Sequence, residues 1–332
     1  MKPMMKAMIS FAVALLLAGA GTAFAASQDK FNLPEPYLGW ESAYLKQFPG
    51  VQTVMDRMIE TTVRQIKEPE QDILHNRICS ALAYKMAVDT KLPKSDQKLA
   101  VVTDILHNID KEEKSAALTD PKVFGEVTAM VARLKKAGHF KASPGFLSDE
   151  AVLKNPKVGG NRALVHHLTG ALTAGAMMKT IGGFSSQDIA RVQVAIVGHS
   201  TGYWYFRQSV DDAIARQDAW KVVFPEPEGA IAQFAHDADL ISQFVPESVV
   251  PEGSKWRVLA AKRWGAKGPV EEAHVVYYVF FRLFEEAKTK PGKAMALEKW
   301  REIRPELVKL MKLKADDDPV KVLGIPKVFQ RS

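Results

Sequence analysis

Histidines and one aspartate pair within apolar helical segments are the residues of this sequence that point most directly to chemistry. The chain has only eight histidines. An imidazole in apolar surroundings costs free energy unless it is hydrogen-bonded or bound to a metal. The residues placed in this way are His75, His107, His166, His199 and the pair Asp237 and Asp239.

Taken singly, each of these residues is explained as a hydrogen-bonded core histidine or a helix-capping carboxylate. Taken together, they predict an internal polar cluster, because four imidazoles and an aspartate satisfy one another poorly without a cation. One or two divalent transition-metal ions (Fe, Mn, Zn or Co) accept such a mixture of nitrogen and oxygen ligands. His167 and His236, which neighbour the predicted ligands, either hydrogen-bond to the ligands or bind the metal themselves, His167 in place of His166. Asp237 is likewise the alternative to Asp239.

The elements that must position these side chains are helices. Apolar residues recur at helical spacing through most of the chain, and no segment alternates with a two-residue period, so an all-α fold is predicted. Asp120 followed by Pro121 is typical of a helix start, and Ser95 and Ser186 precede other helical patterns. The predicted helices span residues 51–66, 73–88, 99–109, 123–134, 164–181, 189–197, 231–244, 270–284 and 295–313.

The first 25 residues have the layout of a secretory signal peptide. Lys2 and Lys6 precede an apolar stretch at 9–21, and Ala23 and Ala25 form a small-residue cleavage signal. We therefore expect an exported protein, in the periplasm or outside the cell; a retained N-terminal anchor is the alternative. No later segment is long and apolar enough for a membrane span.

Composition excludes several classes of protein. A chain with 47% hydrophobic and 25% charged residues can bury a core, so it is not disordered. The single cysteine, Cys79, excludes an internal disulfide and a cysteine-based zinc finger. The net charge of +7 is not accompanied by runs of interleaved basic and aromatic residues, so we expect no nucleic-acid partner. No dinucleotide-binding or P-loop glycine motif is present.

The order of these residues resembles the HD-domain superfamily of metal-dependent phosphohydrolases. The resemblance covers roughly residues 72–244 and implies a helical bundle that binds metal. The family's leading histidine matches His75, its His-Asp pair matches His107-Asn108 within the stretch at 106–111, its further histidines match His166 and His199, and its closing aspartate matches Asp239.

The chain departs from the family at Asn108, where the pair has an amide in place of a metal-binding carboxylate. An amide oxygen can bind a metal but is neutral, so binding of a second divalent ion should be weaker. Asp104, one helical turn earlier, can partly replace the missing charge. The resemblance also suggests Lys111 and Arg77 as cations that face a substrate phosphate.

These patterns predict one HD-like helical domain at 68–250, preceded by a signal peptide at 1–25 and an extension at 26–67. A C-terminal helical extension at 251–332 completes the chain. The favoured function is an exported hydrolase of phosphate mono- or diesters on a small phosphorylated substrate. The alternatives are an HD-type di-iron oxygenase, which iron content and an absorption spectrum would reveal, and a catalytically decayed binding or signalling protein.

Overall fold

The computed structural model describes residues 33–66, 69–110, 117–200 and 219–330, and within these ranges the fold is all-α, as predicted. The predicted signal peptide lies outside the described residues. The α-helices are α2 (Tyr37–Gln47), α3 (Gly50–Gln65), α4 (Glu70–Asp89), α5 (Lys94–Leu106), α6 (Pro121–Lys136), α7 (Glu150–Lys154), α8 (Arg162–Ile181), α9 (Ser186–Gly198), α12 (Ala219–Val223), α13 (Gly229–Ser242), α14 (Pro246–Val249), α15 (Lys255–Trp264), α16 (Gly268–Phe280), α17 (Lys290–Leu310) and α18 (Pro319–Leu323), with 3-10 turns η1 (Leu283–Glu286) and η2 (Lys327–Phe329).

Helix starts follow the local sequence, with two corrections. Asp120 caps α6 by accepting hydrogen bonds from two backbone N–H groups of its first turn, and Pro121 follows it, as predicted. The cap of α9 is Ser185, one residue before the predicted Ser186, because Ser185 forms a capping box with Asp188. Ser95 is not a cap, since α5 already begins at Lys94.

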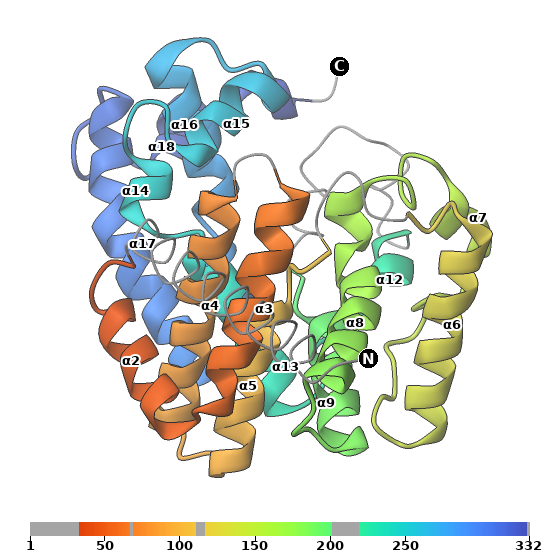
Figure 1. The fold of residues 1–332 in the computed structure, drawn as a ribbon. Helices are drawn as coiled ribbons and strands as arrows, with labels where there is room; N and C mark the ends of the chain where they lie inside the picture. Colours follow the sequence, from red (N-terminus) through yellow and green to blue (C-terminus); the bar gives the residue numbers. More distant parts are fainter. Residues whose placement is uncertain (1–32, 67–68, 111–116, 201–218, 331–332) are drawn as a thin grey trace, which may run out of the picture.

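Five helices form the centre of the bundle: α4, α5, α8, α9 and α13 (Figure 1). Helices α4 and α13 are buried on most sides, as expected for helices that carry apolar or small residues on every face. Helices α8 and α9 approach closely because Gly175 lacks a side chain; a Cβ there would lie 2.3 Å from the Gln193 amide nitrogen. The centre therefore brings together segments that lie far apart in the chain.

The flanking helices share the core of the central bundle. Helices α2 and α3 pack on α4 and α5, and α17 packs on α13 (Figure 1). Buried apolar side chains form one continuous cluster from Leu33 to Met311. Within the described ranges, no helix is both long and apolar enough to cross a membrane.

Candidate metal centre

His75 projects from α4, where its ring is fixed by a serine of α13. The Ser242 hydroxyl donates a hydrogen bond to the Asp239 carbonyl (2.7 Å) and lies 3.2 Å from His75 Nδ1. Because the hydroxyl proton is directed at the carbonyl, its oxygen accepts from the Nδ1–H of His75. This tautomer places the lone pair of His75 on Nε2, the nitrogen that faces the other histidines.

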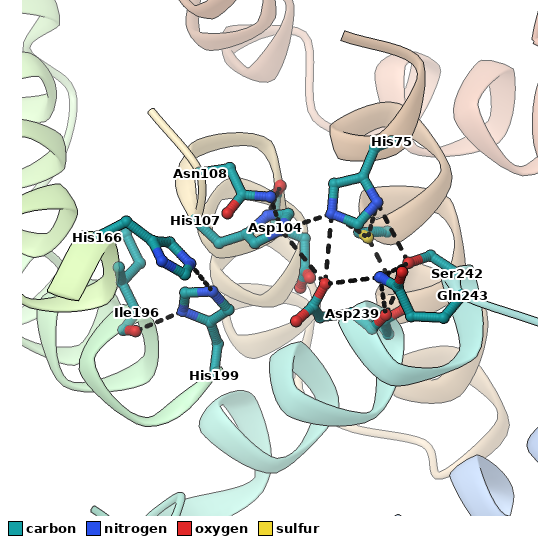
Figure 2. Close-up of polar contacts among 12 residues, drawn as sticks. His75, Asp104, His107, Asn108, His166, Ile196, His199, Asp239, Ser242 and Gln243 are labelled. Carbon is teal, nitrogen blue, oxygen red and sulfur yellow. Dashed lines mark hydrogen bonds and ion pairs between the residues drawn. The ribbon is translucent and has the colours of Figure 1, made fainter. Parts of the chain in front are cut away.

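His107 follows the last residue of α5, and its ring is also fixed through Nδ1. The Nδ1–H donates to the backbone carbonyl of Asp104 at 2.7 Å, which leaves the lone pair on Nε2. That nitrogen lies 3.2 Å from His75 Nε2 and 2.8 Å from the amide nitrogen of Asn108 (Figure 2). His107 itself is fully buried.

His166 of α8 and His199, which follows α9, form a second pair of the same kind. Their Nδ1 atoms donate to the carbonyls of Ala163 (3.1 Å) and Ile196 (2.6 Å). Their Nε2 atoms face each other at 3.3 Å (Figure 2). The ring centroids of His107 and His199 are 4.8 Å apart, so the two pairs form one cluster.

Asp239 of α13 supplies a carboxylate to the first pair. Its Oδ1 lies 3.3 Å from His75 Nε2 and 4.0 Å from His107 Nε2. Burial acts to raise the pKa of Asp239, but positive charge at His75, His107 and His199, whether from protons or from a metal ion on their Nε2 atoms, lowers that pKa well below its usual value. The carboxylate is therefore ionised at neutral pH.

The donor atoms of this cluster fit a metal ion. Two nitrogen lone pairs that face each other across 3.2 Å or 3.3 Å repel, whereas a cation between them attracts both. One ligand atom from each of His75, Cys79, His107 and Asp239 lies within 4.8 Å of the other three, and all four residues are buried. This group can hold a metal ion.

The structure separates the adjacent candidates. Asp239 faces the histidines, whereas Asp237 accepts hydrogen bonds from the backbone of Lys288 (2.7 Å) and Thr289 (2.8 Å) at the start of α17. A Cβ at Gly292 would lie 2.1 Å from that carboxylate, so glycine permits the close approach. His236 Nδ1 lies 3.2 Å from Asp237 Oδ1, so His236 belongs to this contact between α13 and the start of α17 and not to the histidine cluster.

His167 points away from the cluster. Its Nε2–H donates to the Val223 carbonyl at 2.7 Å, and its ring stacks on Phe224. Burial lowers the pKa of His167 to about 3, with only partial compensation from the Val223 hydrogen bond. His166 is thus the member of this pair that faces His199.

Asp104 lies beneath the cluster as a fully buried carboxyl group (Figure 2). Neither of its carboxyl oxygens has a hydrogen-bond partner among the described residues. Burial, and then the negative charge of Asp239, raises the pKa of Asp104 well above its usual value. A raised pKa favours the uncharged form of Asp104, and its role in replacing the charge absent at Asn108 stays a prediction.

Of the two predicted phosphate-binding cations, the structure describes Arg77, which lies away from the cluster. Arg77 donates from Nε to Glu41 at 2.9 Å, on the side of α4 that faces α2. Two helical positions separate it from His75, which places the two side chains on opposite faces of α4. Arg77 therefore joins α2 to α4 and is left out of the proposed site. Lys111 lies outside the described residues.

Sequence reasoning missed three residues here. Cys79 follows His75 by four positions, so both lie on one face of α4, a spacing that is visible in the sequence. Arg162, one turn before His166, forms a buried ion pair with Asp110 at 2.8 Å. The role of Ser242 depends on how α13 docks, and no local pattern reveals it.

No family model, curated protein or solved structure matches the chain. Its function therefore has to be inferred from its own donor atoms and their arrangement.

Proposed function

We propose that the protein is an exported metal-dependent phosphohydrolase that acts on a small phosphate mono- or diester. The observation that carries the proposal is the convergence of four imidazoles, each with its Nδ1–H engaged and its Nε2 turned to the cluster, beside the ionised Asp239. The residue order along the chain adds the resemblance to HD-domain hydrolases.

The donor set suits divalent Fe, Mn, Zn or Co. His75, His107 and Asp239 would hold the primary ion, and His166 with His199 would hold a second. The Oδ1 atom of Asn108 is buried and has no hydrogen bond among the described residues, so a half-turn of the amide offers the ion a further oxygen. A bound ion would lower the pKa of a coordinated water and offset the charge that develops on phosphate.

The protein's own residues restrict how a substrate approaches. His107 and His199 are 0% exposed, while His75, Asn108 and Asp239 retain 8–9% exposure. A phosphate group therefore has to arrive on the side of the latter three residues. The low exposure of these residues favours a small ester over a polymer as the substrate.

Arg162 is the cation that we assign to the phosphate in place of Arg77. It lies on the face of α8 that carries His166, one turn earlier. Its guanidinium is 7% exposed and is held by Asp110 and by the Thr169 hydroxyl at 3.2 Å. A guanidinium oriented in this way binds phosphate oxygens in a fixed geometry.

Elemental analysis of protein purified without a histidine tag tests the metal centre. We expect about one to two transition-metal ions per chain. His107→Ala and Asp239→Ala should each lose the metal. His139→Ala, at a residue in the loop after α6, is the matched control and should keep it. A folded wild-type protein without metal would contradict the proposal and favour a binding protein.

Phosphate release from aryl phosphoesters tests the reaction. Activity should disappear with a chelator and return when the metal is added back. An iron-loaded protein that consumes oxygen with an organic substrate and releases no phosphate would favour the oxygenase instead. Export is tested separately, by the N-terminal sequence of the protein recovered from the periplasm or the medium, which should begin at Ala26.

A further inference from the structure

Cys79 lies where a fourth ligand of the primary ion is needed. It follows His75 by one turn of α4, and its side chain is fully buried. Its Sγ lies 3.7 Å from His75 Nε2 and 3.7 Å from the carbonyl oxygen of Ala238, the residue before Asp239. The sulfur thus lies between α4 and α13, within 4.8 Å of the donor atoms of His75, His107 and Asp239.

Three of the separations between these donor atoms match the edges of a tetrahedral site. For metal bonds of about 2.0–2.1 Å to nitrogen or oxygen and about 2.3 Å to sulfur, the edges of a tetrahedron are about 3.3 Å and about 3.6 Å. The observed values are 3.2 Å between the His75 and His107 nitrogens, 3.3 Å from His75 to Asp239 and 3.7 Å from His75 to sulfur. His107 to Asp239 is longer, at 4.0 Å. The sulfur also lies 3.9 Å from His75 Nδ1, over the imidazole ring, so it has to shift toward the Nε2 side to bind the same ion.

Charge provides an independent reason for a thiolate at this point. Two imidazoles and the Asn108 amide are neutral, so Asp239 is the single anion that these ligands contribute. A divalent ion would then leave a net charge of +1 in a buried cluster, which is costly. A cysteine thiolate brings the site to neutrality.

We propose that the Cys79 thiolate is a ligand of the ion held by His75, His107 and Asp239, and that it supplies the negative charge that Asn108 lacks. Binding converts the thiol to a thiolate and releases one proton to solvent. A soft sulfur ligand selects zinc, cobalt or iron over magnesium and calcium, which prefer oxygen. The inference rests on the proposed metal centre and not on the reaction that it catalyses.

Cobalt substitution tests this ligand directly. Because Cys79 is the only cysteine of the chain, any sulfur-to-cobalt charge-transfer band in the near ultraviolet belongs to it. We expect that band in the wild-type protein, along with the visible bands of tetrahedral cobalt. Cys79→Ser should lose the band and weaken cobalt and zinc binding by at least about 100-fold. A large excess of magnesium should not displace the metal.

Two further variants test the role of charge. Cys79→Asp should regain part of the affinity without the sulfur band. Asn108→Asp should make Cys79→Ser less harmful, because the new carboxylate provides the missing anion. Thermal melts followed by circular dichroism verify that each variant is folded.

The outcomes separate the two proposals. Cobalt bound with visible bands but without the near-ultraviolet band, or equal affinity in wild type and Cys79→Ser, would overturn the thiolate and leave the metal centre intact. Failure of cobalt and zinc to bind the folded wild-type protein would overturn both. If Asn108→Asp did not lessen the effect of Cys79→Ser, the charge argument would be wrong.

Discussion

Asp237 and Asp239 leave α13 two positions apart, and their carboxylates contact different parts of the molecule. Asp239 Oδ1 lies 3.3 Å from His75 Nε2. Asp237 instead accepts hydrogen bonds from Lys288 and Thr289, the two residues that precede α17, including one from the Thr289 hydroxyl at 2.6 Å. Two positions on a helix turn a side chain by roughly 200°, which is why one residue faces the cluster and the other faces the C-terminal helix.

This division predicts opposite effects of mutation. Asp239→Asn should remove the metal. Asp237→Ala should keep the metal but lower the free energy of unfolding by about 2–3 kcal/mol, because it removes three hydrogen bonds from Lys288 and from Thr289, the N-cap of α17. Elemental analysis and urea denaturation measure the two effects. Loss of metal in Asp237→Ala, with metal retained in Asp239→Asn, would reverse the assignment.

Asn108→Asp should strengthen metal binding by about tenfold or more, because it adds an anion beside His107. Competition with a chromophoric chelator measures the affinity. Asn155→Asp makes the same chemical change in the segment after α7 and should have no effect on binding. Equal affinities for Asn108→Asp and the wild type would mean that this side chain does not reach the ion.

Arg77→Met should destabilise the protein without changing its metal content. The side chains of Arg77 and Glu41 are 12% and 7% exposed, so removal of the arginine leaves a carboxylate buried without its cation. We expect a loss of about 3 kcal/mol, much of it recovered in the double variant with Glu41→Leu. Urea denaturation measures both. If instead Arg77→Met raised KM for a phosphoester at unchanged stability, Arg77 would face the substrate after all.

His167→Gln should make the metal-free protein less sensitive to acid. The pKa of His167 is lowered from 6.5 to about 3 in the fold, so below pH 6.5 the unfolded chain binds a proton that the folded chain does not. Stability due to His167 is therefore full above pH 6.5 and falls as the pH drops toward 3, by up to about 1.4 kcal/mol per pH unit.

Urea denaturation of chelator-treated protein at pH 7 and pH 4.5 measures this effect. The wild type should lose about 2–3 kcal/mol more than His167→Gln over that interval. His139→Gln, at the loop after α6, should keep the wild-type acid dependence. Parallel pH profiles for wild type and His167→Gln would contradict the prediction.

The sequence predicted the central helices and the residues that meet between them because both depend on local patterns. A buried histidine needs a partner wherever it lies, so His75, His107, His166 and His199 were identifiable from their apolar surroundings. Three of these rings donate to a carbonyl three residues earlier, at Asp104, Ala163 and Ile196. Their orientation is therefore largely set within their own segments.

What the sequence could not supply depends on how helices dock. The partner of Arg77 lies 36 positions earlier, at Glu41, and no spacing rule predicts that contact. The choice between Asp237 and Asp239 depends on the rotation of α13 about its axis. The spacing of Cys79 from His75 is visible in the sequence, but it does not by itself predict a ligand, because an isolated buried cysteine behaves as a small apolar residue in most proteins.

The placement of the cluster has a mechanical consequence. Its members come from five separate segments, in or directly after α4, α5, α8, α9 and α13, and most of the rings are oriented by their own helix ends. The primary ion would tie α4, α5 and α13 together across the middle of the molecule, and a second ion at His166 and His199 would tie α8 to α9. Loss of the metal would loosen these helices, so the supply of metal would decide how rigid the folded protein becomes.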